Sequence, residues 1–205
     1  MERKAFIAGS TGAVGKTLVR RAESQRVPLL AHVRPRPGVA RGSFDRKFDL
    51  EDVGLLTKHL SECTTVVQLI GTVRARFKRG DTYEVSDIGT TRLLVEAAQR
   101  AQTIDHFVLL SSVGAGRPLG AYLKAKAEAE RLVRESGIPY TIFRPSAFIG
   151  GGHELSPILR RVSGLFEKYR PIHVSALAGA ILRSVLERAP LNAIVEGGSL
   201  WELSD

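Results

Sequence analysis

Three glycines near the start of the chain constrain its fold more than any other feature of the sequence. Gly9, Gly12 and Gly15 follow an apolar run at the spacing G-x-x-G-x-x-G, and Leu18 and Ala22 then recur at helical spacing. This order predicts a strand, a tight turn and a helix, because glycine adopts backbone conformations that other residues avoid and lets a ligand approach. The helix would direct its free N–H groups and the positive end of its dipole at that ligand, which suits a pyrophosphate. A helix that merely packs close to its strand is the alternative.

The rest of the chain alternates between short apolar runs and helical periodicity, in a length of 205 residues that fits one domain. Hydrophobic residues make up 43% of the chain, enough for a core. This alternation predicts an α/β fold with a parallel sheet covered by helices on both faces. After the strand that precedes Gly9, we expect strands at residues 28–33, 43–48, 65–70, 106–110, 139–143 and 193–195. We expect the later helices at residues 53–63, 83–101, 122–137, 154–169 and 173–187.

The charge of the chain favours anionic ligands, because 30 basic residues outnumber 21 acidic ones and leave a net charge of +9. The basic residues are spread along the sequence, aromatic residues make up only 6%, and no zinc-finger or aromatic RNA-binding motif is present. Neither specific nucleic-acid binding nor a metal site is therefore expected. The single cysteine, Cys63, indicates a reducing compartment and hence a cytoplasmic location. No apolar stretch reaches the ~20 residues of a membrane span, and no signal peptide is expected.

Two arginines after the second expected strand bear on the choice of nucleotide. In a dinucleotide-binding fold, an acidic residue at this point holds the ribose 2′-hydroxyl, whereas an arginine suits a 2′-phosphate through paired, charged hydrogen bonds. The sequence has Arg34 and Arg36 there and no acidic residue. It therefore predicts NADP(H) in preference to NAD(H), unless both arginines are ordinary loop charges.

Further candidates for nucleotide contact follow the third and fourth expected strands. Asp49 could accept a hydrogen bond from the adenine amino group and Leu50 could line the adenine slot, but Asp49 could equally cap the next helix. Ile70, Gly71 and Thr72 stand at the carboxyl end of a buried strand, where ligands of open α/β sheets bind. The glycine among them would let a cofactor approach closely.

The stretch of residues 73–81 carries four basic side chains around one aromatic ring. These side chains belong to Arg74, Arg76, Lys78 and Arg79. A solvated loop is the simpler interpretation of so many charges. A lid that meets an anionic substrate or the phosphates of the cofactor is the alternative.

A tyrosine, a lysine and a pair of serines could carry out proton transfer. Tyr122 and Lys126 are four residues apart on an expected helix, so they share one face. The ammonium would favour the phenolate, and the pair could act as a general acid or base at a carbonyl. Ser111 and Ser112 follow the fifth expected strand, and a hydroxyl there could donate to a developing oxyanion. A Tyr-x-x-x-Lys pair alone indicates a surface pair, but the glycine turn and the serines favour the catalytic interpretation.

With these motifs the chain resembles the short-chain dehydrogenase/reductase superfamily in its atypical branch, near the NmrA-like and Tat-interacting-protein-like NAD(P)H-binding proteins. The resemblance covers nearly the whole chain. It is carried by residues 9–15, Arg34, Asp49, Leu50, and residues 107–112, 122–126, 143–145 and 172–178. It implies a Rossmann-type doubly wound sheet in the strand order 3-2-1-4-5-6, with room for a short seventh strand. Residues 1–205 would be one NAD(P)-binding domain, with the substrate side mainly in residues 145–205.

The resemblance also implies roles for individual residues. Ser112 matches the catalytic serine, and Ser111 is the fallback. Tyr122 matches the catalytic acid, and Lys126 matches the lysine that holds the ribose and tunes the tyrosine. The implied cofactor contacts are Gly9, Ser10, Thr11, Gly12, Ala13, Val14, Gly15, Arg34, Asp49, Leu50, Ile70, Gly71, Thr72, Leu110, Ser111, Lys126, Pro145, Ser146, Ala147 and Phe148. The last four fall where the family meets the nicotinamide end.

Two functions are consistent with this pattern. The first is an NADP(H)-dependent oxidoreductase that reduces a small carbonyl, quinone or flavin-like acceptor, with Tyr122 as the proton donor. The second is a non-catalytic NADP(H)-binding sensor or scaffold, which the small C-terminal region favours. At Ser175 the family usually has an aspartate, and the serine could take over its role as a helix cap. We favour the enzyme, acting on a small molecule as a monomer or homodimer.

Overall fold

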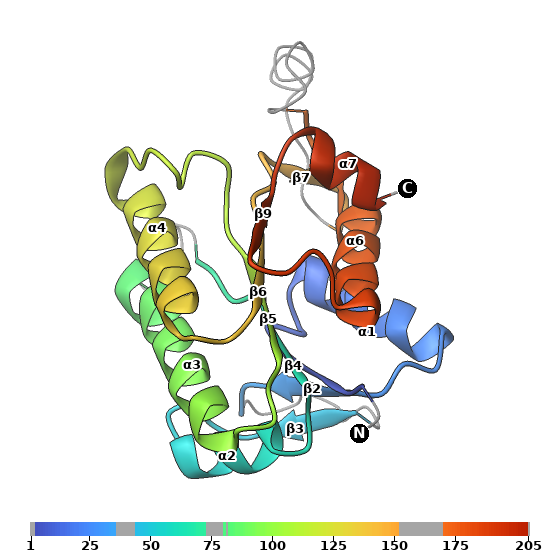
Figure 1. Ribbon diagram of the computed structural model, residues 1–205, viewed down its shortest axis with the longest axis vertical. Coiled ribbons are helices and arrows are strands. Elements are labelled where there is room, and N and C mark those ends of the chain that lie inside the picture. Colours follow the sequence, from blue (N-terminus) through green and yellow to red (C-terminus); the bar gives the residue numbers. More distant parts are fainter. Residues whose placement is uncertain (1–2, 36–43, 73–79, 81, 152–169, 205) are drawn as a thin grey trace.

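Among the residues that the computed structural model describes, which are 3–35, 44–72, 80, 82–151 and 170–204, seven parallel strands form one central sheet (Figure 1). In spatial order these strands are β3 (Asp45–Lys47), β2 (Leu29–Val33), β1 (Ala5–Ala8), β4 (Thr65–Gln68), β5 (His106–Leu110), β6 (Tyr140–Phe143) and β9 (Ala193–Val195). Every neighbouring pair is parallel. This order confirms the expected Rossmann-type sheet, including its short seventh strand.

Helices cover both faces of this sheet (Figure 1). One face carries α1 (Ala13–Ser24), α6 (Val174–Glu187) and α7 (Gly198–Ser204). The other face carries α2 (Val53–Leu60), α3 (Thr90–Ala101) and α4 (Gly120–Glu135). A short π-helix, η2 (Glu84–Gly89), leads directly into α3.

Strand β1 shows why these layers form. All four of its residues are buried, and alternate side chains enter different cores. Ala5 and Ile7 pack with α1 and α6, whereas Phe6 and Ala8 pack with α2 and α3. Because both faces are covered, the strand is a continuous apolar run. Ligands of such a sheet bind at its carboxyl-terminal edge, where the loops begin.

Several elements are shorter than the periodicity indicated. The third strand covers Asp45–Lys47 rather than residues 43–48, and α2 ends at Leu60 rather than at residue 63. Strand β4 ends at Gln68, because the side-chain oxygen of Gln68 accepts the N–H of Ile70 at 2.8 Å and takes the place of a strand partner.

Other elements differ in kind from the expectation. The helix expected over residues 83–101 is a π-helix followed by an α-helix, and α4 begins at Gly120, ahead of Tyr122. Two further strands, β7 (Phe148–Ile149) and β8 (Ile172–His173), form a separate parallel pair. Neither this pair nor α7 was expected, because elements of a few residues carry too little periodicity to be recognised.

Three expectations lie outside the described residues: the second arginine, Arg36, the basic residues 74–79, and the helix at residues 154–169. The assignment of residues 1–205 to a single domain stays a prediction. Within the described part of the chain, no helix has both the length and the apolar character that crossing a membrane requires.

A buried histidine lies at the start of β5. His106 is fully buried, and its Nε2 lies 2.8 Å from Oγ1 of Thr141. That hydroxyl donates to the carbonyl oxygen of Pro190, so Nε2 carries a proton and donates to it. Nδ1 has no hydrogen-bond partner among the described residues, so a proton there would be a buried, unpaired charge. Burial, and secondarily the charges of Arg188 and Arg3, lowers the pKa of His106 to about 4.

We expect the folded state to lose stability as the pH falls from about 6.5 to about 4. Over this range the unfolded chain protonates His106 and the folded chain does not, so acid favours unfolding. A pKa lowered from 6.5 to about 4 corresponds to about 3 kcal/mol in the free energy of unfolding. Chemical denaturation of the wild type and of His106→Gln across this range should show a shallower pH dependence in the variant. The same pH dependence in both proteins would contradict the prediction.

Candidate functional site

The glycine turn between β1 and α1 has the geometry of a phosphate cradle. Gly9 has a φ of +93°, and a Cβ atom on Gly15 would lie 2.1 Å from the carbonyl oxygen of Gly9, so the backbone requires both glycines. Gly12 is the N-cap of α1 and makes no side-chain cap, and the first turn of the helix contains no acidic residue. The first N–H groups and the positive end of the helix dipole are therefore suited to an anionic ligand.

A cavity of about 250 Å³ adjoins this turn. It is lined by Ser10, Thr11, Lys16, Val19, Arg20, Ala31, Val33 and Asp45. Lys16 and Arg20 stand one turn apart on α1, and Arg34 is exposed directly after β2. Arg34 was expected from the sequence but the other two cations were not, although their helical spacing after the glycines could have indicated them. A larger cavity of about 360 Å³, between α1, α6 and α7, is lined by none of the predicted site residues.

Asp49 does not cap the helix that follows it. Its carboxylate accepts the N–H of Glu51 at 3.1 Å, whereas Asp52 is the N-cap of α2 and accepts the N–H of Leu55 at 2.9 Å. The capping alternative for Asp49 is therefore wrong, and its contact with adenine stays a prediction. Leu50 is buried in the core that α2 covers.

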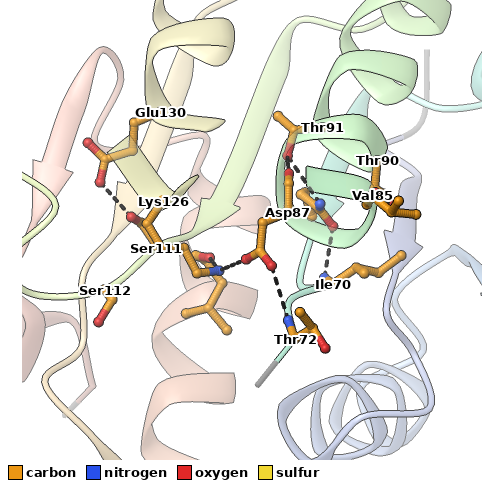
Figure 2. A network of polar contacts seen from close by, with 12 residues as sticks. Ile70, Thr72, Val85, Asp87, Thr90, Thr91, Ser111, Ser112, Lys126 and Glu130 are labelled. Atoms are coloured by element: carbon orange, nitrogen blue, oxygen red, sulfur yellow. Dashed lines mark hydrogen bonds and ion pairs between the residues drawn. The ribbon is translucent and has the colours of Figure 1, made fainter. Parts of the chain in front are cut away.

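Beyond β4 the chain is held by a buried carboxylate that the sequence analysis missed. Asp87, on η2, accepts the N–H of Thr72 at 3.1 Å and lies 2.9 Å from Nζ of Lys126 (Figure 2). A Cβ atom on Gly71 would lie 3.0 Å from that Nζ and 3.1 Å from Oδ1 of Asp87, so glycine gives these two groups room to meet. The hydroxyl of Thr72 is buried and has no hydrogen-bond partner among the described residues.

Helix α4 presents the tyrosine and the lysine at the same edge of the sheet. Nζ of Lys126 lies 6.0 Å from the ring centroid of Tyr122 and donates to the carbonyl oxygen of Leu110 at 3.2 Å. Lys126 is buried, whereas Tyr122 is 36% exposed. The rings of Tyr122 and Tyr83 are 5.6 Å apart between centroids. The lysine is thus anchored to the end of β5, and the tyrosine ring is partly open to solvent.

The two serines after β5 have different surroundings. Ser111 donates to the carboxylate of Glu130 at 2.5 Å, and Arg144 donates to the same carboxylate through Nε at 2.8 Å and Nη2 at 2.5 Å. These hydrogen bonds raise the pKa of Arg144. Ser112 makes a longer contact, 3.4 Å, to the carbonyl oxygen of Val113, and Figure 2 shows it apart from Glu130. Ser112 therefore stays the candidate oxyanion donor.

Residues 145–148 leave β6 at the same edge as the other candidates. The carbonyl oxygen of Pro145 accepts the N–H of Val113 at 3.0 Å, and that of Ala147 accepts the N–H of Ile172 at 3.0 Å. Phe148 then begins β7. Residues 145–148 therefore connect the loop that carries Ser111 and Ser112 to β8.

The start of α6 corrects one expectation. His173 is the N-cap of this helix, because its Nδ1 accepts the N–H of Ser175 at 3.2 Å. Ser175 lies in the first turn, with its hydroxyl 2.7 Å from the same Nδ1. The expectation that Ser175 takes over the cap is therefore wrong, because Ser175 lies inside the first turn and its own N–H is capped by His173.

A family model described as NAD(P)H-binding matches residues 9–187. The chain belongs to this NAD(P)H-binding family. The match extends from the glycine turn to the end of α6, so it includes every candidate site residue. Together with the sheet order, membership of the NAD(P)H-binding family confirms the resemblance to the atypical short-chain dehydrogenase/reductase superfamily.

Two proteins to which the chain is similar are named as chloroplastic. The chain is 27% identical to divinyl chlorophyllide a 8-vinyl-reductase of Cucumis sativus, over 94% of this chain and 52% of that protein. It is 31% identical to an uncharacterised chloroplastic protein of Arabidopsis thaliana, over 98% of this chain and 75% of that protein. The chain thus spans about half the length of the vinyl-reductase. The cytoplasmic location expected for this chain stays a prediction.

Solved structures agree with the fold of the NAD(P)H-binding family. The structure of MoeE5 in complex with UDP-glucuronic acid and NAD has a TM-score of 0.73 and 22% identity, covering 94% of this chain and 75% of that one. This likeness supports the Rossmann-type fold and nothing finer. The residues of the present chain also fit a dinucleotide. The start of α1, Lys126 and the Thr72 hydroxyl, which has no hydrogen-bond partner within the described part of the chain, all belong to the carboxyl-terminal edge.

We expect alanine to have very different effects at two glycines of the turn. In Gly15→Ala the new Cβ would meet the Gly9 carbonyl oxygen at 2.1 Å, so the backbone must move and the free energy of unfolding should fall by about 3 kcal/mol or more. In Gly12→Ala the nearest contact is 3.4 Å away, and the change should stay within about 1 kcal/mol. Chemical denaturation of both variants provides the measurement. Equal losses of stability would show that the turn is not constrained in this way.

Proposed function

We propose that the chain is an NADP(H)-dependent oxidoreductase that reduces a small carbonyl, quinone or flavin-like acceptor. The observation that carries this proposal is that the uncapped start of α1 and the Tyr122–Lys126 face of α4 belong to one edge of the sheet. Membership of the NAD(P)H-binding family and the name of the vinyl-reductase relative support a reductive reaction. When bound, the cofactor supplies the hydride.

In this proposal, residues of the chain bind the cofactor, orient the acceptor and transfer the proton. The first turn of α1 binds the diphosphate through its backbone N–H groups. Lys126 holds the ribose, and Ser112 donates a hydrogen bond to the acceptor oxygen. Tyr122, whose ring is partly open to solvent, transfers the proton. Residues 145–205 supply most of the substrate side of a single domain.

A non-catalytic NADP(H)-binding protein is the second candidate. It is favoured by the commitment of the Lys126 ammonium to Asp87 and to the Leu110 carbonyl oxygen. Such a protein would bind the cofactor tightly and turn over no acceptor.

The cofactor preference can be measured directly. Arg34, supported by Lys16 and Arg20 beside the cavity, would bind the 2′-phosphate, so calorimetry should give a lower Kd for NADPH than for NADH. Arg34→Ala should reduce that difference by about tenfold to a hundredfold, which is the effect of losing paired, charged hydrogen bonds. Arg183→Ala, which removes an arginine paired with Glu187 on α6, is the matched control and should change nothing. Equal affinities of the wild type for the two nucleotides would reject the role of Arg34.

The proton donor can be tested by turnover. With a panel of carbonyl, quinone and flavin acceptors, NADPH oxidation by Tyr122→Phe should have a kcat at least a hundredfold below that of the wild type, because general-acid catalysis contributes about that much. Its Kd for NADPH should stay within about threefold. Tyr140→Phe, at the amino-terminal end of β6, is the control and should keep full activity. An unchanged kcat in Tyr122→Phe would refute the assignment, and tight cofactor binding without turnover in the wild type would favour the non-catalytic protein.

A further inference from the structure

Asp87 and Lys126 form a buried ion pair where β4 and β5 end (Figure 2). Oδ1 lies 2.9 Å from Nζ, and the two side chains are 1% and 8% exposed. Oδ2 also accepts the N–H of Thr72 at 3.1 Å, and the ammonium donates to the carbonyl oxygen of Leu110 at 3.2 Å. Backbone groups beyond two neighbouring strands therefore hold both ions in place, and together the ions carry no net charge.

The π-helix is what brings Asp87 to this position. A π turn inserts an extra residue into the helical turn and is common at functional sites. The hydroxyl of Thr91 donates to the main-chain carbonyl of Asp87 at 2.7 Å and accepts from the side-chain amide of Gln68 at 3.2 Å. These bonds connect η2 and α3 to the end of β4. They leave the Asp87 carboxylate facing Lys126 and Gly71.

Stability alone does not explain this pair. Removing two charges from water offsets most of their mutual attraction, so a buried ion pair contributes little net stability. What the pair of Asp87 and Lys126 changes is the net charge of the site, because the carboxylate cancels the charge of the ammonium. The second buried contact on α4 is different, because the guanidinium of Arg144 lies 2.5 Å from the carboxylate of Glu130 and also 3.6 Å from that of Glu196. Asp87 and Lys126, by contrast, pair one anion with one cation.

We infer that Asp87 cancels the charge of Lys126, so that the site binds oxidised and reduced nicotinamide cofactor with similar affinity. This inference rests on the proposed function, in which Lys126 holds the ribose that carries the nicotinamide. An oxidised nicotinamide ring is positively charged, whereas a reduced ring is neutral. A lysine without a counter-charge disfavours the oxidised ring, and the carboxylate removes that bias. Asp87 is therefore a positioning and charge-balancing residue that acts through Lys126.

The test compares the Kd values of NADP⁺ and NADPH, measured by calorimetry at one pH and one salt concentration. The wild type should bind the two forms within about threefold of each other. Asp87→Asn keeps the shape of the side chain and an acceptor for Thr72 but leaves Lys126 without its counter-charge. Its preference for NADPH should therefore rise about tenfold. The double variant Asp87→Asn/Lys126→Gln has no net charge again and should return the ratio of the two Kd values to that of the wild type, even if both affinities fall.

Glu62→Gln provides the matched control. It removes one carboxylate from a pair with Lys4 at the amino-terminal edge of the sheet and should leave the ratio unchanged. Three results would overturn the inference while leaving the proposed function intact: a wild type that prefers NADPH more than about tenfold, an Asp87→Asn variant that weakens both forms equally, or a double variant that keeps the Asp87→Asn ratio. A wild type that binds neither nucleotide would overturn the proposed function and this inference with it.

Discussion

The close approach of α1 to the end of β1 is the constraint on which the rest of the site depends. The helix starts so near the strand that a Cβ atom on Gly15 would lie 2.1 Å from the carbonyl oxygen of Gly9. Backbone atoms form both sides of this contact, so no change of rotamer could make room for a larger residue. The contact places the first turn of α1 at the carboxyl-terminal edge of the sheet. The segment after β7 packs on the same turn, where a Cβ on Gly151 would come within 3.0 Å of Ala13.

Two buried ion pairs hold the opposite half of the site. Lys126 and Asp87 join α4 to η2, and Arg144 and Glu130 join the end of β6 to α4. Both pairs use α4, the helix that carries Tyr122, so the tyrosine keeps a defined position although its own ring is partly exposed. Because desolvation offsets most of the attraction within such pairs, they specify geometry and charge more than they add stability. The glycine contact therefore fixes the proposed phosphate cradle, and the ion pairs fix the proposed reactive groups on α4.

Much of this arrangement could be predicted from the sequence, and the failures at individual site residues share one cause. The buried strands are continuous apolar runs, and the helices after them have clear periodicity, so the alternation predicted a parallel sheet covered by helices on both faces. The order of its strands came from the resemblance to the short-chain dehydrogenase/reductase superfamily, and the structure confirms it. Asp87 was missed because a carboxylate in a helical segment is typical of a solvated face, and its burial depends on a π turn that no pattern indicated. The choice between Ser111 and Ser112 likewise depends on where Glu130 lies in the folded chain. Asp49 was a plausible helix cap until the structure gave that position to Asp52.

By itself the sequence determined the succession of strands and helices and the location of the glycine turn. These features depend on local backbone geometry and on the spacing of buried side chains, and residues that are close in sequence determine both. Only the tertiary structure decided which charged side chains lose their water and which partner each one meets. Asp87 and Lys126 come from different helices, and the two serines lie after β5 whereas the carboxylate that distinguishes them lies on α4. Whether such a group is solvated, paired or available to a ligand depends on what folding brings beside it, and no local pattern contains that information.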